Sequence, residues 1–179
     1  MPGHESGRTT SLPSVPGLYR PVTFGGLTLP GNLFLAPVAG YTDRAFRAVC
    51  AEAGADFTFT ELVSAEAVRR NPALYGLAPE GSGAVNIHAA LVRRGGDKPY
   101  AVQLFASEPE AVEAAAALLA PLRPDAVDIN AGCPVPKVVK TGAGAALMRK
   151  PALLGRVTAA AVRAASRALG GAPVTVKMR

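Results

Sequence analysis

A single thiol in an irregular segment is the feature of this sequence best suited to chemistry. Cys133 follows a glycine and precedes a proline in the stretch DINAGCPVPKVVKTGAGAAL, residues 128–147. The glycines and prolines prevent a helix from starting at once, so we expect a loop that presents Asn130 and Cys133. Because packing has little reason to demand sulfur in such a loop, the thiol is a candidate acid.

The other cysteine, Cys50, is predicted to be an ordinary packed residue of the helical stretch AFRAVCAEAG. Neither cysteine has a second Cys or His at metal-ligand spacing, so the sequence indicates neither a metal site nor a disulfide framework. The stretch TGAGAAL that follows Cys133 lacks the Gly-Lys-Ser/Thr ending of a phosphate-binding loop and does not fit GxGxxG. We therefore interpret it as flexible backbone.

Short apolar runs alternate with amphipathic stretches from residue 33 onward, which is typical of βα units. Strands that are buried on both faces, and so parallel, are predicted at residues 33–38, 57–62, 100–105, 126–130 and 174–178. Helices are predicted at residues 43–53, 64–70, 108–120 and 151–168. Thr42 or Asp43 is expected to cap the first helix and Ser107 the third. Residues 22–29 predict a hairpin, and residues 71–99 predict a mostly exposed connection.

Unusual residues gather where the predicted strands end. They are Pro37 to Gly40, Glu61, Gln103, Asn130 to Pro134, and Lys177 to Arg179. Ligands bind at the carboxyl ends of parallel strands, and contributions from five separate strands favour a barrel over an open sheet. A TIM (β/α)8 barrel typically has roughly 250 residues, so we expect an α/β chain truncated after about five strands. Glu61 has a simpler interpretation as a capping partner for the next helix.

The bulk composition fits a basic, soluble protein. The formal charge of +6 attracts polyanions such as RNA, although a soluble basic enzyme is the equal alternative. The longest apolar runs are too short to span a membrane, and residues 1–20 lack the apolar core of a signal peptide. We expect a disordered lead-in over residues 1–20 and a reducing, cytoplasmic location for the whole chain.

Five motifs resemble, in order and spacing, successive motifs of the tRNA-dihydrouridine synthases. They are PVAGYTDRAFR at 37–47, FTFTE at 57–61, VQLFA at 102–106, DINAGCP at 128–134 and VTVKMR at 174–179. The resemblance is closest to the bacterial B-type members and covers residues 20–179. It implies that residues 21–179 form the N-terminal portion of an FMN-binding TIM-barrel domain, without the second half of the barrel and the helical tRNA-binding domain.

The resemblance also implies a cofactor site. Pro37, Val38 and Ala39 match the turn that lies against the flavin mononucleotide (FMN), with Val38 in place of the more usual Met. Gln103 matches the residue that hydrogen-bonds the polar edge of the flavin, and Lys177 matches the lysine that accompanies its reduced anion. NADPH is the implied reductant.

On the substrate side, Asn130 and Arg179 match residues that orient the target uracil of tRNA, and Cys133 matches the catalytic acid. In this chemistry the flavin delivers hydride to C6 of a uracil flipped out of its stack, and the thiol supplies the proton. The full-length protein is expected to be a monomer.

Two alternatives remain open. A flavin-dependent dehydrogenase acting on free pyrimidines or dihydroorotate would also place a Cys or Ser in an Asn-rich loop. An inactive truncated fragment, with at most tRNA-binding ability, is the other. From the residues alone, Gln103 and Asn130 could simply satisfy the backbone of their loops.

Overall fold

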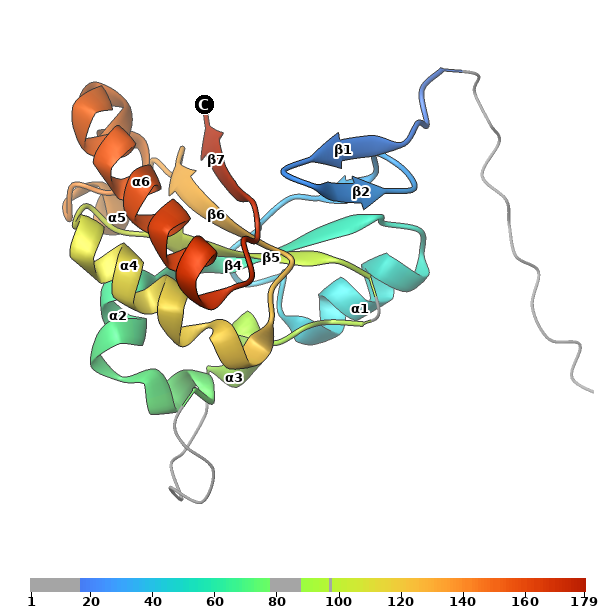
Figure 1. Cartoon of the computed structure of the whole chain (residues 1–179), viewed down its shortest axis with the longest axis horizontal. Coiled ribbons are helices and arrows are strands. Elements are labelled where there is room, and N and C mark those ends of the chain that lie inside the picture. Colours follow the sequence, from blue (N-terminus) through green and yellow to red (C-terminus); the bar gives the residue numbers. More distant parts are fainter. Residues whose placement is uncertain (1–16, 78–87, 97) are drawn as a thin grey trace, which may run out of the picture.

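The computed structural model describes residues 17–77, 88–96 and 98–179. Most of the predicted lead-in therefore lies outside the described residues. The main element is a parallel sheet in which each strand lies beside its predecessor in the chain (Figure 1). Its strands are β3 (Phe34–Leu35), β4 (Phe57–Ser64), β5 (Tyr100–Phe105), β6 (Ala126–Ala131) and β7 (Val174–Met178). This curved half-barrel agrees with the predicted strand positions.

The first strand is shorter than predicted. It ends at Leu35 because the following residues form a turn, in which the Tyr41 and Thr42 N–H groups donate to the Val38 carbonyl at 3.1 and 3.0 Å. Pro37 has no N–H group to continue the ladder. Because β3 ends early, residues 37–40 leave the sheet and form this turn at the carboxyl end of the strand.

Helices cover the outer face of the sheet (Figure 1). The longer ones are α1 (Arg44–Glu52), α2 (Ala65–Arg70), α4 (Pro109–Leu118) and α6 (Pro151–Ala168). Short helices α3 (Ala89–Val92) and α5 (Pro136–Val139) and the 3-10 turns η1 (Pro72–Tyr75), η2 (Ala120–Leu122) and η3 (Gly144–Arg149) fill the connections. The α4 helix packs between α2 and α6, and alanines on the buried faces of α4 and α6 allow this close approach.

The N-terminal cap of α1 is as predicted, whereas that of α4 is not. Asp43 caps α1 by accepting the Phe46 N–H at 2.9 Å, as predicted. The prediction that Ser107 caps α4 is wrong, because the N-cap is Glu108 and makes no side-chain capping bond. The Ser107 hydroxyl instead donates to the Thr141 carbonyl at 2.7 Å. It therefore joins the loop after β5 to the loop after β6.

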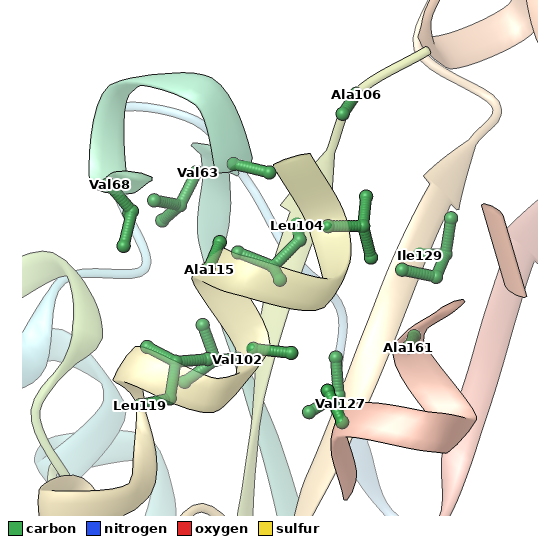
Figure 2. Close-up of a cluster of buried hydrophobic side chains, with 14 of the residues drawn as sticks. Val63, Val68, Val102, Leu104, Ala106, Ala115, Leu119, Val127, Ile129 and Ala161 are labelled. Atoms are coloured by element: carbon green, nitrogen blue, oxygen red, sulfur yellow. The ribbon is translucent and has the colours of Figure 1, made fainter. Parts of the chain in front are cut away.

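The two faces of the sheet differ in chemistry. Val102 and Leu104 of β5 and Val127 and Ile129 of β6 pack outward against α4 and α6 (Figure 2). Because strand side chains alternate, Ala101, Gln103, Asp128 and Asn130 lie on the inner face. Each fully buried Val, Leu or Ile contributes about 1.5–3 kcal/mol, so the outer core fixes the sheet and the inner face is available for function.

A small hairpin closes the amino-terminal end of the inner face. Strands β1 (Val22–Phe24) and β2 (Leu27–Leu29) pair antiparallel across Gly25 and Gly26, both at positive φ. Leu29 packs with Phe57, Ala101 and Ala126, with Phe24 beside them. The predicted hairpin is confirmed, and it leaves the carboxyl ends of the strands uncovered.

The connection over residues 71–99 is less exposed than predicted. Tyr75, Leu77 and Val92 are buried in the outer core, and Ala89 is also buried, although residues 78–87 and 97 lie outside the described part. The sequence pattern hid this burial because the apolar residues fall in short turns without a regular period.

Candidate active site

A chain of hydrogen-bonded side chains crosses the inner face near the strand ends. Asp128 of β6 accepts the Thr175 hydroxyl at Oδ1 and the Gln103 Nε2 at Oδ2, both at 2.6 Å. Asn130 Nδ2 then donates to Gln103 Oε1 at 2.9 Å. Strands β5, β6 and β7 bring these groups together because their registers pair Gln103 with Asp128 and Asp128 with Thr175.

The same chain reaches the backbone that carries the thiol. Asn130 Oδ1 accepts the Cys133 N–H at 3.0 Å and the Gly132 N–H at 3.3 Å. The Cys133 carbonyl in turn accepts the Ala145 N–H at 2.9 Å. Cys133 is half-buried, and its turn is held on both sides. Asn130 is the penultimate residue of β6 and not part of an open loop, which corrects that expectation.

The glycine-rich stretch after Cys133 has a packing role. A Cβ on Gly144 would lie 2.7 Å from the Cys133 carbonyl oxygen and 2.8 Å from Val138 Cγ1. Gly144 also has a φ of +59°, where an L side chain is strained. Part of the stretch predicted as flexible backbone is thus packed tightly against Cys133.

A cavity of about 400 Å³ opens on the inner face beside this network. Its walls are mostly apolar and are formed by Phe24, Phe34, Ala36, Pro37, Phe59, Asp128, Thr175, Val176 and Lys177. Among the described residues Lys177 makes no ion pair. A cavity of this size can hold a small ligand, and Asp128 and Lys177 are the charged residues among the lining residues.

The turn after β3 is tied to the neighbouring strand. Glu61 Oε2 accepts the Gly40 N–H at 2.6 Å. The register of β4 against β5 shifts between Phe59 and Leu62, and this irregularity lets Glu61 reach the turn. The interpretation of Glu61 as a helix-capping partner is therefore wrong, since Ser64 caps α2.

Burial dominates the electrostatics of the inner carboxyl group. It raises the pKa of Asp128, while the hydrogen bonds from Gln103 and Thr175 and the charge of Lys177 act in the opposite direction. A carboxyl whose pKa is raised on folding makes a less favourable contribution to stability as the pH rises above its unfolded value. The fold therefore accommodates Asp128 at this place and is not stabilised by its charge.

Most of the predicted site residues lie in one region. Pro37 and Lys177 line the cavity, while Val38 and Ala39 lie in the turn beyond Pro37. The exposed Arg179 follows β7, and its backbone nitrogen would lie 3.4 Å from a Cβ on Gly132. The remaining three, Gln103, Asn130 and Cys133, form the hydrogen-bonded series described above.

Sequence reasoning missed Asp128 and Thr175 as site residues. The signal for Asp128 was its spacing of two from Asn130, which places both side chains on one face of a strand. Thr175 has the same relation to Lys177.

Two kinds of feature are absent from the described ranges. Over residues 17–77, 88–96 and 98–179, every helix is too short or too polar to span a lipid bilayer. The same ranges contain no group of three or more His, Cys, Asp or Glu side chains that could hold a metal ion.

A parallel half-barrel with polar side chains and a thiol gathered at the carboxyl ends of its strands is the arrangement of (β/α) barrel enzymes. A family model described as "Dihydrouridine synthase (Dus)" matches residues 34–179. This chain belongs to that family, so the recognition made from the five motifs is confirmed.

Relatives agree with this assignment. A "Probable tRNA-dihydrouridine synthase" of Treponema pallidum is 44% identical over 163 residues, which are 90% of this chain and 44% of that protein. A "tRNA-dihydrouridine synthase B" of Pseudomonas aeruginosa is 36% identical over 88% of this chain and 42% of that protein. The chain thus spans less than half the length of these curated relatives.

One solved structure supports the fold alone. It is titled "X-structure of a variant of NCR from zymomonas mobilis" and has a TM-score of 0.51 and 18% sequence identity. The match covers 91% of this chain and 59% of that chain.

Proposed function

We propose that this chain supplies the catalytic half-barrel of a tRNA-dihydrouridine synthase, which reduces uridine in tRNA to 5,6-dihydrouridine with FMN and NADPH. The observation that carries the proposal is the bond from the Cys133 N–H to Asn130 at the carboxyl end of β6. It places a thiol, in a turn held on both sides, at the end of the sheet where barrel enzymes bind their substrates.

The inner cavity suits FMN. Phe34, Pro37 and Phe59 offer apolar surfaces to a flat ring system, and Lys177 offers a positive charge to its anionic edge. Val38 and Ala39 continue the turn beyond Pro37, and Glu61 holds that turn in place. Bound FMN would supply the hydride that adds to C6 of the uracil.

Gln103 and Asn130 present donors to this region. Each amide nitrogen has two protons, and in the described part of the chain each nitrogen makes one hydrogen bond. The second protons are available for carbonyl oxygens, which line the polar edges of both flavin and uracil. Arg179, beside Gly132, adds a cation for orienting the uracil.

Cys133 has the role of proton donor. Adding hydride to C6 builds negative charge toward C5 and the adjacent carbonyl, and a thiol near C5 completes the reduction by transferring its proton. Because the reaction needs this thiol at a fixed position, the bonds on both sides of the Cys133 peptide support the role.

The curated relatives are longer than this chain. The remaining strands of a closed eight-stranded barrel would correspond to the part of those relatives that lies outside the match. Within the described residues, β3 and β7 are the edges of the sheet, and closure would cover them. We propose tRNA as the partner, bound partly by the cations Lys137, Lys140, Arg149 and Lys150. The full-length enzyme is proposed to be a cytoplasmic monomer.

The test compares two matched cysteine substitutions. The chain is fused to the part of the Treponema pallidum relative that lies outside the match, and Cys133→Ala is compared with Cys50→Ala. Dihydrouridine is measured by mass spectrometry of digested tRNA, and FMN binding by quenching of flavin fluorescence. We expect Cys133→Ala to bind FMN and form little dihydrouridine, and Cys50→Ala to behave as the parent.

Two outcomes would count against the proposal. Normal turnover in Cys133→Ala would remove the thiol from the mechanism. Turnover of free orotate in place of tRNA would favour a dehydrogenase acting on free pyrimidines.

A further inference from the structure

The inner hydrogen-bonded series has a fixed polarity. Its inner end is Asp128, whose ionised carboxylate only accepts, and its outer end is the Cys133 N–H, which only donates. Two side-chain amides, those of Gln103 and Asn130, lie between these ends. Each amide must therefore turn its nitrogen toward Asp128 and its oxygen toward Cys133.

The two ends demand the same orientation of both amides. Reversing Gln103 would place its nitrogen against that of Asn130, and reversing Asn130 would place its nitrogen against the Cys133 N–H. Either change would leave a buried donor without an acceptor, because Gln103 is 1% exposed and Asn130 is 7% exposed. The series is consequently an all-or-none unit.

We propose that Asp128 is a positioning residue, which acts through Gln103 and Asn130 to fix the turn that carries Cys133. This inference rests on the proposed role of Cys133 as proton donor. Asp128 does not need to touch substrate in order to act, because its contribution is the acceptor that orients Gln103.

Thr175 gives Asp128 tolerance to protonation. Its hydroxyl now donates to Asp128 Oδ1, but a hydroxyl also accepts. If Oδ1 is protonated, as burial favours, the Thr175 hydroxyl reverses and Oδ2 still accepts from Gln103. An asparagine at position 128 can use the same arrangement, with its nitrogen toward Thr175.

This reasoning predicts a non-additive pair of nearly isosteric substitutions. Asp128→Asn keeps the series through Thr175, and Thr175→Val keeps it through the carboxylate. In the double variant the amide nitrogen introduced at position 128 meets a methyl group, or it turns toward Gln103 and forces both amides to reverse. The mismatch is best tolerated at the more exposed outer end, where water can reach it, so the Cys133 N–H loses its acceptor.

The measurement is hydrogen exchange of individual backbone amides by NMR on the 179-residue chain, without cofactor or tRNA. We expect protection of the Cys133 amide to change less than about threefold in each single variant and to fall about tenfold or more in the double variant. The Phe46 amide is the internal control, because its N–H donates to the side chain three residues earlier, Asp43, as the Cys133 N–H donates to Asn130. Its protection from exchange should not change. Asp128→Asn with Thr175→Ser restores a hydroxyl and should restore protection.

Additive small effects in the double variant, or equal losses at Cys133 and Phe46, would overturn the inference. If the double variant does not fold, Gln103→Leu replaces it. That substitution removes the middle of the series, and unchanged Cys133 protection would then overturn the inference. Failure of the proposed function would be seen in a separate experiment, as normal dihydrouridine formation by the Cys133→Ala variant.

Discussion

Replacing Gly144 with alanine tests how tightly the Cys133 turn is packed. The new Cβ would lie 2.7 Å from the Cys133 carbonyl oxygen and 2.8 Å from Val138 Cγ1. The left-handed backbone at position 144 adds about 1–2 kcal/mol of strain, and overpacking adds about 1–3 kcal/mol. We therefore expect Gly144→Ala to lower the free energy of unfolding by about 2–5 kcal/mol.

The chain contains a matched control for this substitution. Gly155 lies inside α6, has no positive φ, and a Cβ there would meet nothing within 4 Å. Gly155→Ala should raise the free energy of unfolding by about 0.5–1 kcal/mol, because glycine is a poor helix residue.

Urea unfolding followed by circular dichroism gives both values, and the rate of thiol alkylation in a Cys50→Ala background reports on Cys133. We expect faster alkylation in Gly144→Ala, because the displaced turn exposes the half-buried thiol, and no change in Gly155→Ala. The reasoning is refuted if Gly144→Ala is as stable as the parent, or if the two alanine variants shift stability in the same direction.

Three further predictions concern charged groups. Glu61→Ala removes the acceptor of the Gly40 N–H, so exchange of that amide should accelerate by about tenfold, and an unchanged rate would show that the turn holds itself. Hydrogen bonds from Arg69 hold the pKa of Glu66 down to about 2. The Glu66–Arg69 ion pair therefore stabilises α2 fully at pH values above the ordinary carboxyl pKa, and this stabilisation is lost as the pH falls through about 2. An NMR titration of Glu66 with a midpoint near 4.5 would contradict that arrangement. Lys177→Ala in the fused protein should weaken FMN binding by about tenfold to a hundredfold, the loss of one charge-assisted contact of about 1.5–3 kcal/mol, and equal fluorescence titrations would exclude Lys177 from the site.

Much of the fold could be predicted from the sequence because its strands are short apolar runs bounded by turn residues. Residues 100–105 and 174–178 form strands over the predicted limits, and Pro151 starts α6 as expected. The first strand was predicted too long because Ala36 and Pro37 continue its apolar run while their backbone leaves the sheet. Hydrophobicity alone does not show where a ladder ends.

The site could be predicted less completely. Cys133 was selected as a candidate acid from its position between glycine and proline, and a resemblance to known motifs selected Gln103 and Asn130 as further candidates. Their bond to each other depends on the register of β5 against β6, which no local pattern specifies. The hydrogen bonds of Asp128 could not be predicted for the same reason, because its partners Gln103 and Thr175 lie on the neighbouring strands.

The order of the strands has a consequence for how this chain folds. From β4 to β7, each strand of the five-stranded sheet pairs with the strand that precedes it in the chain, so a single crossover separates the two partners. Parallel pairing across a crossover is slower than pairing within a hairpin, because the connecting segment must be closed first. Because the chain is synthesised from its amino terminus, the partner of each of these strands is already present when the strand leaves the ribosome. The Asp128 carboxylate would then gain its Gln103 partner as soon as β6 forms, and only the Thr175 contact would await the arrival of β7.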